Sequence, residues 1–404
     1  MTKHFCHFLL LGLLLAGPMA MQAATCQAPA AVETSHRDQA KRLFQRIAGV
    51  PPTAAQLQQA AEALACQDAG FAVNAAAVAL DDKHFYNITL KNFATPWTNE
   101  ARSVFAPLND YSATVIGMVR DDKDFREVLY GNYLYAATGV AGLPAYSTTD
   151  NQHYRQLEER DISLKDHLQE MPQYYLPEHA SAGVMTSRAA ARAFFIDGTN
   201  RAMFRFTLIN HLCRDLEQVN DISRSPDRIR QDVSRSPGGD SRLFLNTCLG
   251  CHAGMDPLTQ AYAYYHYRYD ADNDPDGENG YLEYTEGQVQ PKYLINSSNF
   301  AYGYVTTDDR WDNYWRAGRN SHLGWSMALP GSGQGAKSMG QELAHSEAFA
   351  QCQVKKVFSA VCLREPVNTA DKSRLAVMVD DFVNRHNYRL KPVFADAALY
   401  CRGD

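Results

Sequence analysis

The pentapeptide Cys248-Leu249-Gly250-Cys251-His252 determines most of what can be inferred from this sequence. Its pattern, C-x-x-C-H, is the attachment motif of c-type haem: two thiols add across the haem vinyl groups, and the histidine that follows binds the iron. On a helical turn, positions i, i+3 and i+4 share one face, so both sulfur atoms and the imidazole reach one porphyrin edge. We therefore expect covalent haem on Cys248 and Cys251, with His252 as the proximal ligand.

Two other chemistries use closely spaced cysteines. A thioredoxin-like redox pair has the same C-x-x-C spacing, and a structural zinc site needs a second ligand pair at regular spacing. No second pair of that kind stands out in the sequence. Haem attachment is therefore the favoured interpretation, while the redox pair and the zinc half-site stay open as alternatives.

The amino terminus has the features of a secretory signal peptide. A short basic start precedes an apolar run at residues 8–16, and small residues follow up to Ala24. The run is too short to span a bilayer, which predicts a signal peptide over residues 1–24. Because haem is attached to thiols outside the cytoplasm, this signal agrees with the pentapeptide. We expect a bacterial protein that is periplasmic or secreted.

The composition is that of an ordinary globular protein. The chain is 45% hydrophobic and 21% charged, and its formal net charge is -6. After cleavage about 380 of the 404 residues remain, enough for two domains with hydrophobic cores. The mild acidity argues against binding to nucleic acid. No later stretch approaches the roughly eighteen apolar residues of a spanning helix, so stable membrane insertion is not expected.

The cysteine count predicts disulfides. Of nine cysteines, the signal peptide removes Cys6 and the haem takes two, which leaves six: Cys26, Cys66, Cys213, Cys352, Cys362 and Cys401. An even remainder in an exported chain suggests three disulfides. A helix at residues 349–361 would hold Cys352 and Cys362 about 15 Å apart, beyond the roughly 7 Å limit for a disulfide. We favour Cys26–Cys66, Cys213–Cys352 and Cys362–Cys401; the alternative is that some are buried thiols.

Apolar residues recur at helical spacing in several parts of the chain. Between residues 40 and 47 they fall at i, i+3, i+4 and i+7, and Thr53-Ala54-Ala55-Gln56 is a capping box that opens the next helix. The same periodicity predicts helices at residues 71–80, 125–134, 201–216, 349–361 and 375–382. Strand-like alternation is scarce. The fold is therefore expected to be mainly α with long loops.

Prolines and glycine in a polar stretch near residues 175–185 indicate a domain boundary. We expect a helical N-terminal domain of unknown role at residues 25–180 and a cytochrome-c-like haem domain with long loops at residues 181–404. The segment at residues 223–242, SRSPDRIRQDVSRSPGGDSR, is polar and rich in turn residues. We interpret it as a solvated connection rather than a loop that lines the haem approach.

The sixth iron ligand is not fixed by a motif. Small single-haem cytochromes often place a methionine tens of residues after the attachment site, on a loop before a closing helix. Met327, in the stretch WSMALPG at residues 325–331, has such a position, and Met339 and His322 are its rivals. A methionine or histidine ligand gives a saturated electron carrier, whereas an open position permits peroxide or oxygen chemistry. The alternative for any methionine is a place in the core.

Residues 272–283, DNDPDGENGYLE, fit the twelve-residue calcium loop D-x-D-x-D-G-x5-E. Carboxylates at alternate positions can converge on one cation, and Gly277 allows the sharp turn. The candidate metal ligands are Asp272, Asp274, Asp276, Glu278 and Glu283. Pro275 and Asn279 depart from the usual pattern. The loop is expected either to hold a structural Ca2+ or to be an acidic, solvated surface loop.

Residues 181–270 resemble the cytochrome-c-like regions of large planctomycete-type secreted proteins, whose domains are of unknown function. The resemblance rests on the opening GVMT at residues 183–186, on Leu212-Cys213, and on the continuation of the haem motif into Asp-Pro-Leu at residues 256–258. The segment GQELAHSEAFAQC at residues 340–352 is similar to that family's closing helix. After residue 258 the sequence departs from the family pattern. The resemblance implies a secreted haem protein and gives no substrate.

Three functions are compatible with these features. The first is an exported mono-haem c-type cytochrome that passes single electrons to or from a redox partner protein. The second is a peroxidase-like haem enzyme with an open sixth position, although bacterial di-haem peroxidases normally carry two haem pentapeptides and this chain has one. The third is a haem-bearing docking subunit of a redox complex. An electron carrier is favoured over a catalyst.

Overall fold

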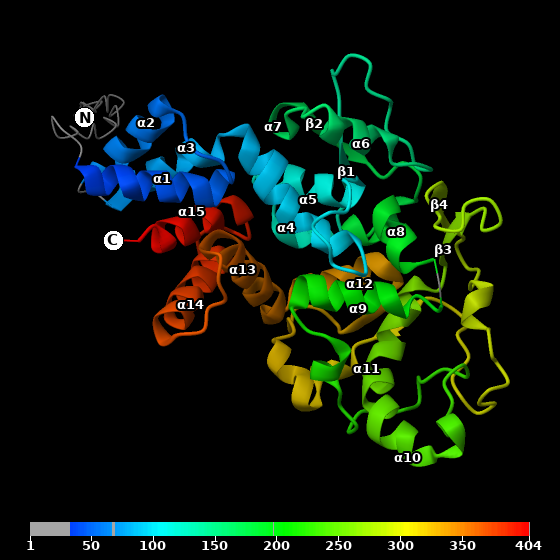
Figure 1. Cartoon of the computed structure of the whole chain (residues 1–404). Helices are drawn as coiled ribbons and strands as arrows, with labels where there is room; N and C mark the ends of the chain where they lie inside the picture. Colours follow the sequence, from blue (N-terminus) through cyan, green and yellow to red (C-terminus); the bar gives the residue numbers. More distant parts are fainter. Residues whose placement is uncertain (1–32, 67–68, 197, 404) are drawn as a thin grey trace, which may run out of the picture.

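The computed structural model describes residues 33–66, 69–196 and 198–403 (Figure 1). Within these ranges the chain is mainly helical, and its strands form three two-stranded antiparallel sheets, which confirms the mainly α class. The signal peptide predicted for residues 1–24 lies outside them, as does Cys26. In the part of the chain that is described, no helix is both long and apolar enough to cross a membrane.

Helices from the two ends of the chain pack together. Helices α1 (Thr34–Ala48), α2 (Ala54–Ala65) and α3 (Ala69–Leu80) contact one another, and α15 (Leu390–Cys401) lies against α1 and α3 (Figure 1). The apolar face expected for α1 is buried in this group. The Thr53 hydroxyl accepts a hydrogen bond from the Gln56 N–H, and the Gln56 side chain accepts one from the Thr53 N–H. The predicted capping box is confirmed.

The middle of the chain is organised around α5 (Asp110–Arg120), which is buried along nearly its whole length. Strands β1 (Tyr133–Ala137) and β2 (Leu168–Pro172) pair beside it. The helix predicted at residues 125–134 is wrong, because a short 3₁₀ helix at Phe125–Leu129 is followed by β1. The apolar residues at the start of this stretch fill a single turn, and the aromatic side chains of β1 favour an extended backbone.

Helix α9 (Arg201–Thr207) continues as a π-helical turn, Leu208–Leu212, and the chain leaves the helix at Cys213, which has a left-handed backbone. The helix predicted at residues 201–216 therefore ends earlier than expected. Cys213 is bonded to Cys352, with the two Cα atoms 5.3 Å apart. The helix thus ends at the residue that forms the disulfide with α13.

Helix α13 (Glu347–Cys362) confirms the helix predicted at residues 349–361. Its last residue, Cys362, is bonded to Cys401 of α15, with a Cα–Cα distance of 5.4 Å. Two of the three predicted disulfides are therefore confirmed. The third pairing, Cys26–Cys66, includes a residue outside the described ranges and stays a prediction.

The remaining helices and strands are short, apart from α11, α12 and α14. They are α4 (Lys91–Ala94), α6 (Gln152–Glu159), α7 (Leu164–His167), α8 (Arg188–Phe194), α10 (Ser241–Leu243), α11 (Leu249–Thr259), α12 (Gly335–Ala344), α14 (Thr369–Asn384), β3 (Tyr265–Tyr269), β4 (Gly280–Tyr284), β5 (Arg310–Asp312) and β6 (Ser332–Gln334). Helix α14 confirms the pattern seen at residues 375–382. One hydrophobic core extends from α1 through α5 to α12, α13 and α15. The division at residue 180 stays a prediction.

Candidate haem site

The haem pentapeptide lies at the start of α11. Cys248 ends a π-helical turn, Phe244–Cys248, and Cys251 and His252 lie in the first turn of the α-helix that follows. The helical spacing expected for the motif is therefore present. Cys248 and Cys251 are the free cysteines of the described ranges, and both are partly exposed. Burial raises the pKa of the Cys251 thiol, so this sulfur is held as a neutral thiol rather than as a reactive thiolate.

A buried carboxylate positions the His252 imidazole. The Nδ1 atom of His252 lies 3.1 Å from Oδ1 of Asp256, one helical turn further along α11. Asp256 is fully buried, whereas the His252 side chain is 21% exposed. A histidine that donates one ring N–H to a carboxylate has its tautomer and orientation fixed, and its other nitrogen is left to bind a metal. The arrangement leaves Nε2 of His252 free to bind a metal.

Asp256 is in turn held by arginine. Nε and Nη2 of Arg201 donate to the two carboxylate oxygens of Asp256 at 2.8 and 3.0 Å. Nη1 and Nη2 of Arg201 also donate to Asp232, at 2.8 and 3.0 Å. Burial alone would raise the pKa of Asp256, but Arg201, followed by His252 and Arg230, outweighs it and holds that pKa well below its usual range. The carboxylate beside His252 is therefore a permanent negative charge.

Two glycines allow α11 to pack closely enough to form this site. A Cβ atom at Gly254 would lie 1.9 Å from Nε1 of Trp315, and one at Gly250 would lie 2.0 Å from the Asn220 side-chain oxygen. Trp315 is fully buried beneath the helix. Any larger residue at either glycine would push α11 outward, because real Cβ atoms do not approach so closely. The glycines thus set the depth at which Cys251 and His252 are held.

The polar segment at residues 223–242 does not run freely through solvent. Ile229 and Val233 are buried with Phe244 and Ala253, and this small cluster packs against Cys248 and its neighbour in the motif. The interpretation as a solvated connection is therefore wrong, since Ile229 and Val233 anchor the segment against α11 and the turn that precedes it. In the sequence, only the apolar residues Ile229 and Val233 indicated that this segment is anchored. The many serines and arginines around them made the segment look solvated.

Arg230, in the same segment, supplies a buried positive charge. Its side chain is 1% exposed and Nε lies 3.6 Å from Oδ1 of Asp232, but neither Nε nor Nη1 makes a hydrogen bond within the described ranges. Its backbone N–H lies 3.3 Å from Oδ2 of Asp256. A buried guanidinium with unsatisfied N–H groups suits a carboxylate such as a haem propionate. Free thiols, an oriented imidazole and this cation are together a fit for covalent haem.

The candidates for the sixth ligand are not brought together with His252 in a common cluster. Met327 is 91% exposed on the turn that follows Trp325, and His322 is also exposed. Met339 is fully buried in α12. His322 lies in the 3₁₀ helix Gly318–Leu323, where its Nδ1 contacts the Arg319 carbonyl oxygen. Met327 as the sixth ligand stays a prediction.

The residues of the expected calcium loop do not converge on one point. Glu278 pairs with Arg155 at 3.0 Å and with Arg192 at 2.6 Å, and Glu283, on β4, pairs with Arg268 at 2.8 Å. The carboxylate of Asp274 accepts hydrogen bonds from two backbone N–H groups of its own loop. Across the described ranges, no three His, Cys, Asp or Glu side chains are grouped to hold a metal. Of the five candidate ligands, Glu278 and Glu283 make ion pairs there, and Asp272, Asp274 and Asp276 make none. Calcium binding stays a prediction without geometric support.

Comparison of the chain with protein-family models, with curated proteins and with solved structures finds no match. The resemblance to planctomycete-type secreted proteins thus rests on the residues quoted for it. A functional assignment has to be argued from the geometry around α11.

Proposed function

We propose that this chain is an exported mono-haem c-type cytochrome that passes single electrons to and from a redox partner protein. The observation that carries the proposal is the state of the cysteines. Four of the described cysteines form the disulfides Cys213–Cys352 and Cys362–Cys401, while the two of the C-x-x-C-H motif are unpaired at the start of one helix. Disulfides are typical of exported chains, and an unoxidised C-x-x-C pair there is what haem attachment requires.

The residues around α11 would hold the haem in a defined way. Cys248 and Cys251 would form the thioether bonds, and His252 would bind the iron through Nε2 while Nδ1–H donates to Asp256. Bound haem supplies a one-electron ferric/ferrous couple. The negative charge of Asp256, kept in place by Arg201, makes the imidazole a stronger electron donor and favours the ferric state. The backbone N–H of Arg230 donates to the same carboxylate, and the buried charge of its side chain also lowers the pKa of Asp256.

A peroxidase-like enzyme is the second candidate, and one observation favours it. The imidazole of His252 is hydrogen-bonded to a buried carboxylate, and the three candidate sixth ligands are either exposed or locked in the core. An electron-rich proximal histidine opposite an open position is suited to oxygen–oxygen bond cleavage. The single pentapeptide and the absence of a second haem motif in the sequence favour the electron carrier.

The optical spectrum of the purified ferric protein tests the proposal and separates the two candidates. A low-spin spectrum that cyanide and peroxide leave unchanged supports an electron carrier with a sixth protein ligand. A high-spin spectrum that shifts on addition of cyanide supports the enzyme. The variant Met327→Leu tests the sixth ligand. If Met327 binds the iron, the variant should show the high-spin spectrum in place of the low-spin one. A protein without haem absorption would contradict both.

A further inference from the structure

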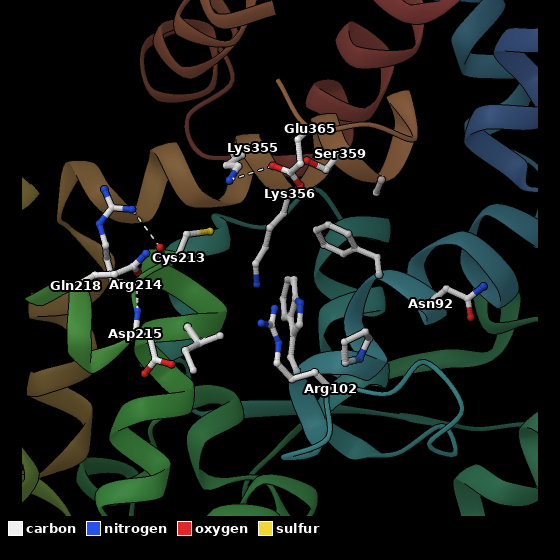
Figure 2. Close-up of a pocket in the computed structure, with 15 residues that line it drawn as sticks. Asn92, Arg102, Cys213, Arg214, Asp215, Gln218, Lys355, Lys356, Ser359 and Glu365 are labelled. Atoms are coloured by element: carbon white, nitrogen blue, oxygen red, sulfur yellow. Dashed lines mark hydrogen bonds and ion pairs between the residues drawn. The ribbon is translucent and has the colours of Figure 1, made fainter. Parts of the chain in front are cut away.

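A cavity of about 520 Å³ lies away from the haem helix, between α4, the segment that carries Cys213, and α13 (Figure 2). None of the residues of the haem site lines it. Phe93, Trp97 and Ile209 form an apolar wall, and Arg102, Arg214, Lys355 and Lys356 contribute positive charge. A cleft of this size with an apolar wall and a few charged groups is typical of a small-molecule site.

Only some of these charges are neutralised. Lys355 pairs with Glu365 at 3.0 Å, and Asp215, the second acidic residue of the lining, pairs with Arg205 outside it at 2.7 Å. Arg214 donates a hydrogen bond to the backbone carbonyl of Cys213. Each carboxylate is therefore ion-paired with another cation, although the charge of Asp215 also acts on Arg102 without forming an ion pair with it.

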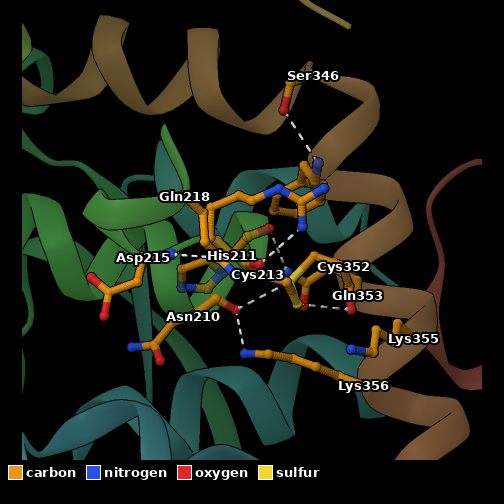
Figure 3. Close-up of a disulfide and its surroundings, with 12 residues drawn as sticks. Asn210, His211, Cys213, Asp215, Gln218, Ser346, Cys352, Gln353, Lys355 and Lys356 are labelled. Atoms are coloured by element: carbon orange, nitrogen blue, oxygen red, sulfur yellow. Dashed lines mark hydrogen bonds between the residues drawn. A yellow bond between two sulfur atoms is a disulfide. The ribbon is translucent and has the colours of Figure 1, made fainter. Parts of the chain in front are cut away.

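Lys356, Arg102 and Arg214 make no ion pair within the described ranges, and of these three Arg102 acts electrostatically on Lys356. The Nζ atom of Lys356 lies 4.0 Å from the centre of the Trp97 ring and donates to the Asn210 carbonyl (Figure 3). The exposed side chain of Arg102 makes no hydrogen bond or ion pair within the described ranges, and both side chains point toward the middle of the cavity (Figure 2). Burial first, and repulsion by Arg102 second, lower the pKa of Lys356 well below its usual value. A half-buried ammonium normally has an anion as its partner.

We propose that this cavity binds a small organic carboxylate, with the carboxylate group between Lys356 and Arg102 and the apolar body against Trp97 and Phe93. A carboxylate satisfies the guanidinium as a fork and the ammonium as a point charge. The apolar wall selects against a bare inorganic anion, which would leave Trp97 and Phe93 uncovered. This site is independent of the haem and of the electron-transfer proposal.

Titration calorimetry on the full exported chain tests the site with three probes: benzoate, its neutral analogue benzamide, and inorganic phosphate. We expect saturable binding of benzoate and none of benzamide or phosphate. Lys356→Met keeps the aliphatic stem over Trp97 but removes the charge, and Arg102→Gln removes the second cation. Each variant should weaken benzoate at least about tenfold, the usual loss for one charge-assisted hydrogen bond. The control is the double variant Lys355→Gln/Glu365→Gln, which removes an exposed ion pair as a unit and should change the affinity less than about twofold.

The melting temperature of each variant shows whether a loss of binding comes only from a loss of folding. Because folding disfavours the charged form of Lys356, the Lys356→Met variant should melt at the same temperature as the wild type or higher. Benzamide that binds as tightly as benzoate, phosphate that competes with it, equal benzoate affinity in Lys356→Met, or no benzoate binding at all would overturn the proposal. A stable variant that has lost benzoate binding would support it.

Discussion

Replacing Asp256 by asparagine should be the most destabilising conservative change near the haem helix. The Asp256 side chain is fully buried, accepts two hydrogen bonds from Arg201 and lies 3.1 Å from Nδ1 of His252. Asparagine has nearly the same shape, but it removes the charge and turns one acceptor into a donor that faces the guanidinium. Breaking a buried ion pair by removing one partner costs about 3–5 kcal/mol. Since Arg201 keeps its second partner, Asp232, we expect a loss of about 3 kcal/mol.

The assay is urea unfolding near neutral pH, with the free energy of unfolding taken from the transition midpoint at an unchanged slope. The control is Asp232→Asn, which leaves Arg201 paired with the more deeply buried Asp256 and should cost about 1–2 kcal/mol. In the haem-bearing protein, Asp256→Asn should also raise the reduction potential, because His252 loses its anionic partner. A cost below about 1 kcal/mol for Asp256→Asn, or a larger cost for Asp232→Asn, would refute this reasoning.

Two further changes probe other parts of the structure. Burial, with Lys292 and Arg268, lowers the pKa of the half-buried His266 to about 4, so the unfolded chain takes up the proton first, near pH 6.5. The free energy of unfolding of the wild type should therefore fall by up to about 1.4 kcal/mol per pH unit as the pH is lowered from roughly 6.5 to 4. In urea titrations at several pH values, His266→Gln should show a smaller decline. The same pH profile in the variant and the wild type would contradict this prediction. Gly254→Ala should cost about 1–3 kcal/mol, despite the better helix propensity of alanine, because its Cβ would meet the indole of Trp315. The companion variant Trp315→Phe should recover part of that loss, and a Gly254→Ala protein as stable as the wild type would show that α11 can move.

Local sequence patterns predicted the helices with regular apolar faces well. Helices α1, α2, α13 and α14 carry apolar residues at i, i+3 and i+4, and Thr53 with Gln56 marks the start of α2. The predicted helix argued against a Cys352–Cys362 disulfide, and the two favoured pairings Cys213–Cys352 and Cys362–Cys401 are present in the structure. For the helices, the deciding information lies within one or two helical turns of the residues concerned.

Tertiary contacts decided the features that sequence patterns missed. Glu278 lies within a calcium-loop motif, but its carboxylate forms ion pairs with Arg155 and Arg192, which are distant in sequence. Only one of the two contacts that orient His252 could be predicted from the sequence. Asp256 is four residues after His252, which on a helix predicts contact. Arg201, which holds Asp256, lies 55 positions before it. No local pattern announces a partner at that distance. The fold class was therefore predictable from the sequence, but the network that orients the imidazole was not.

The most direct test of the account is the intact mass of the exported, processed polypeptide, compared with that of the Cys248→Ser/Cys251→Ser variant. The account predicts a wild-type mass about 616 Da above that of the bare processed chain, from one haem joined by two thioether bonds, and no such increment in the double variant. A wild-type protein of unmodified mass, produced in a bacterium that attaches haem to other c-type cytochromes, would contradict the assignment of Cys248, Cys251 and His252 as a haem site.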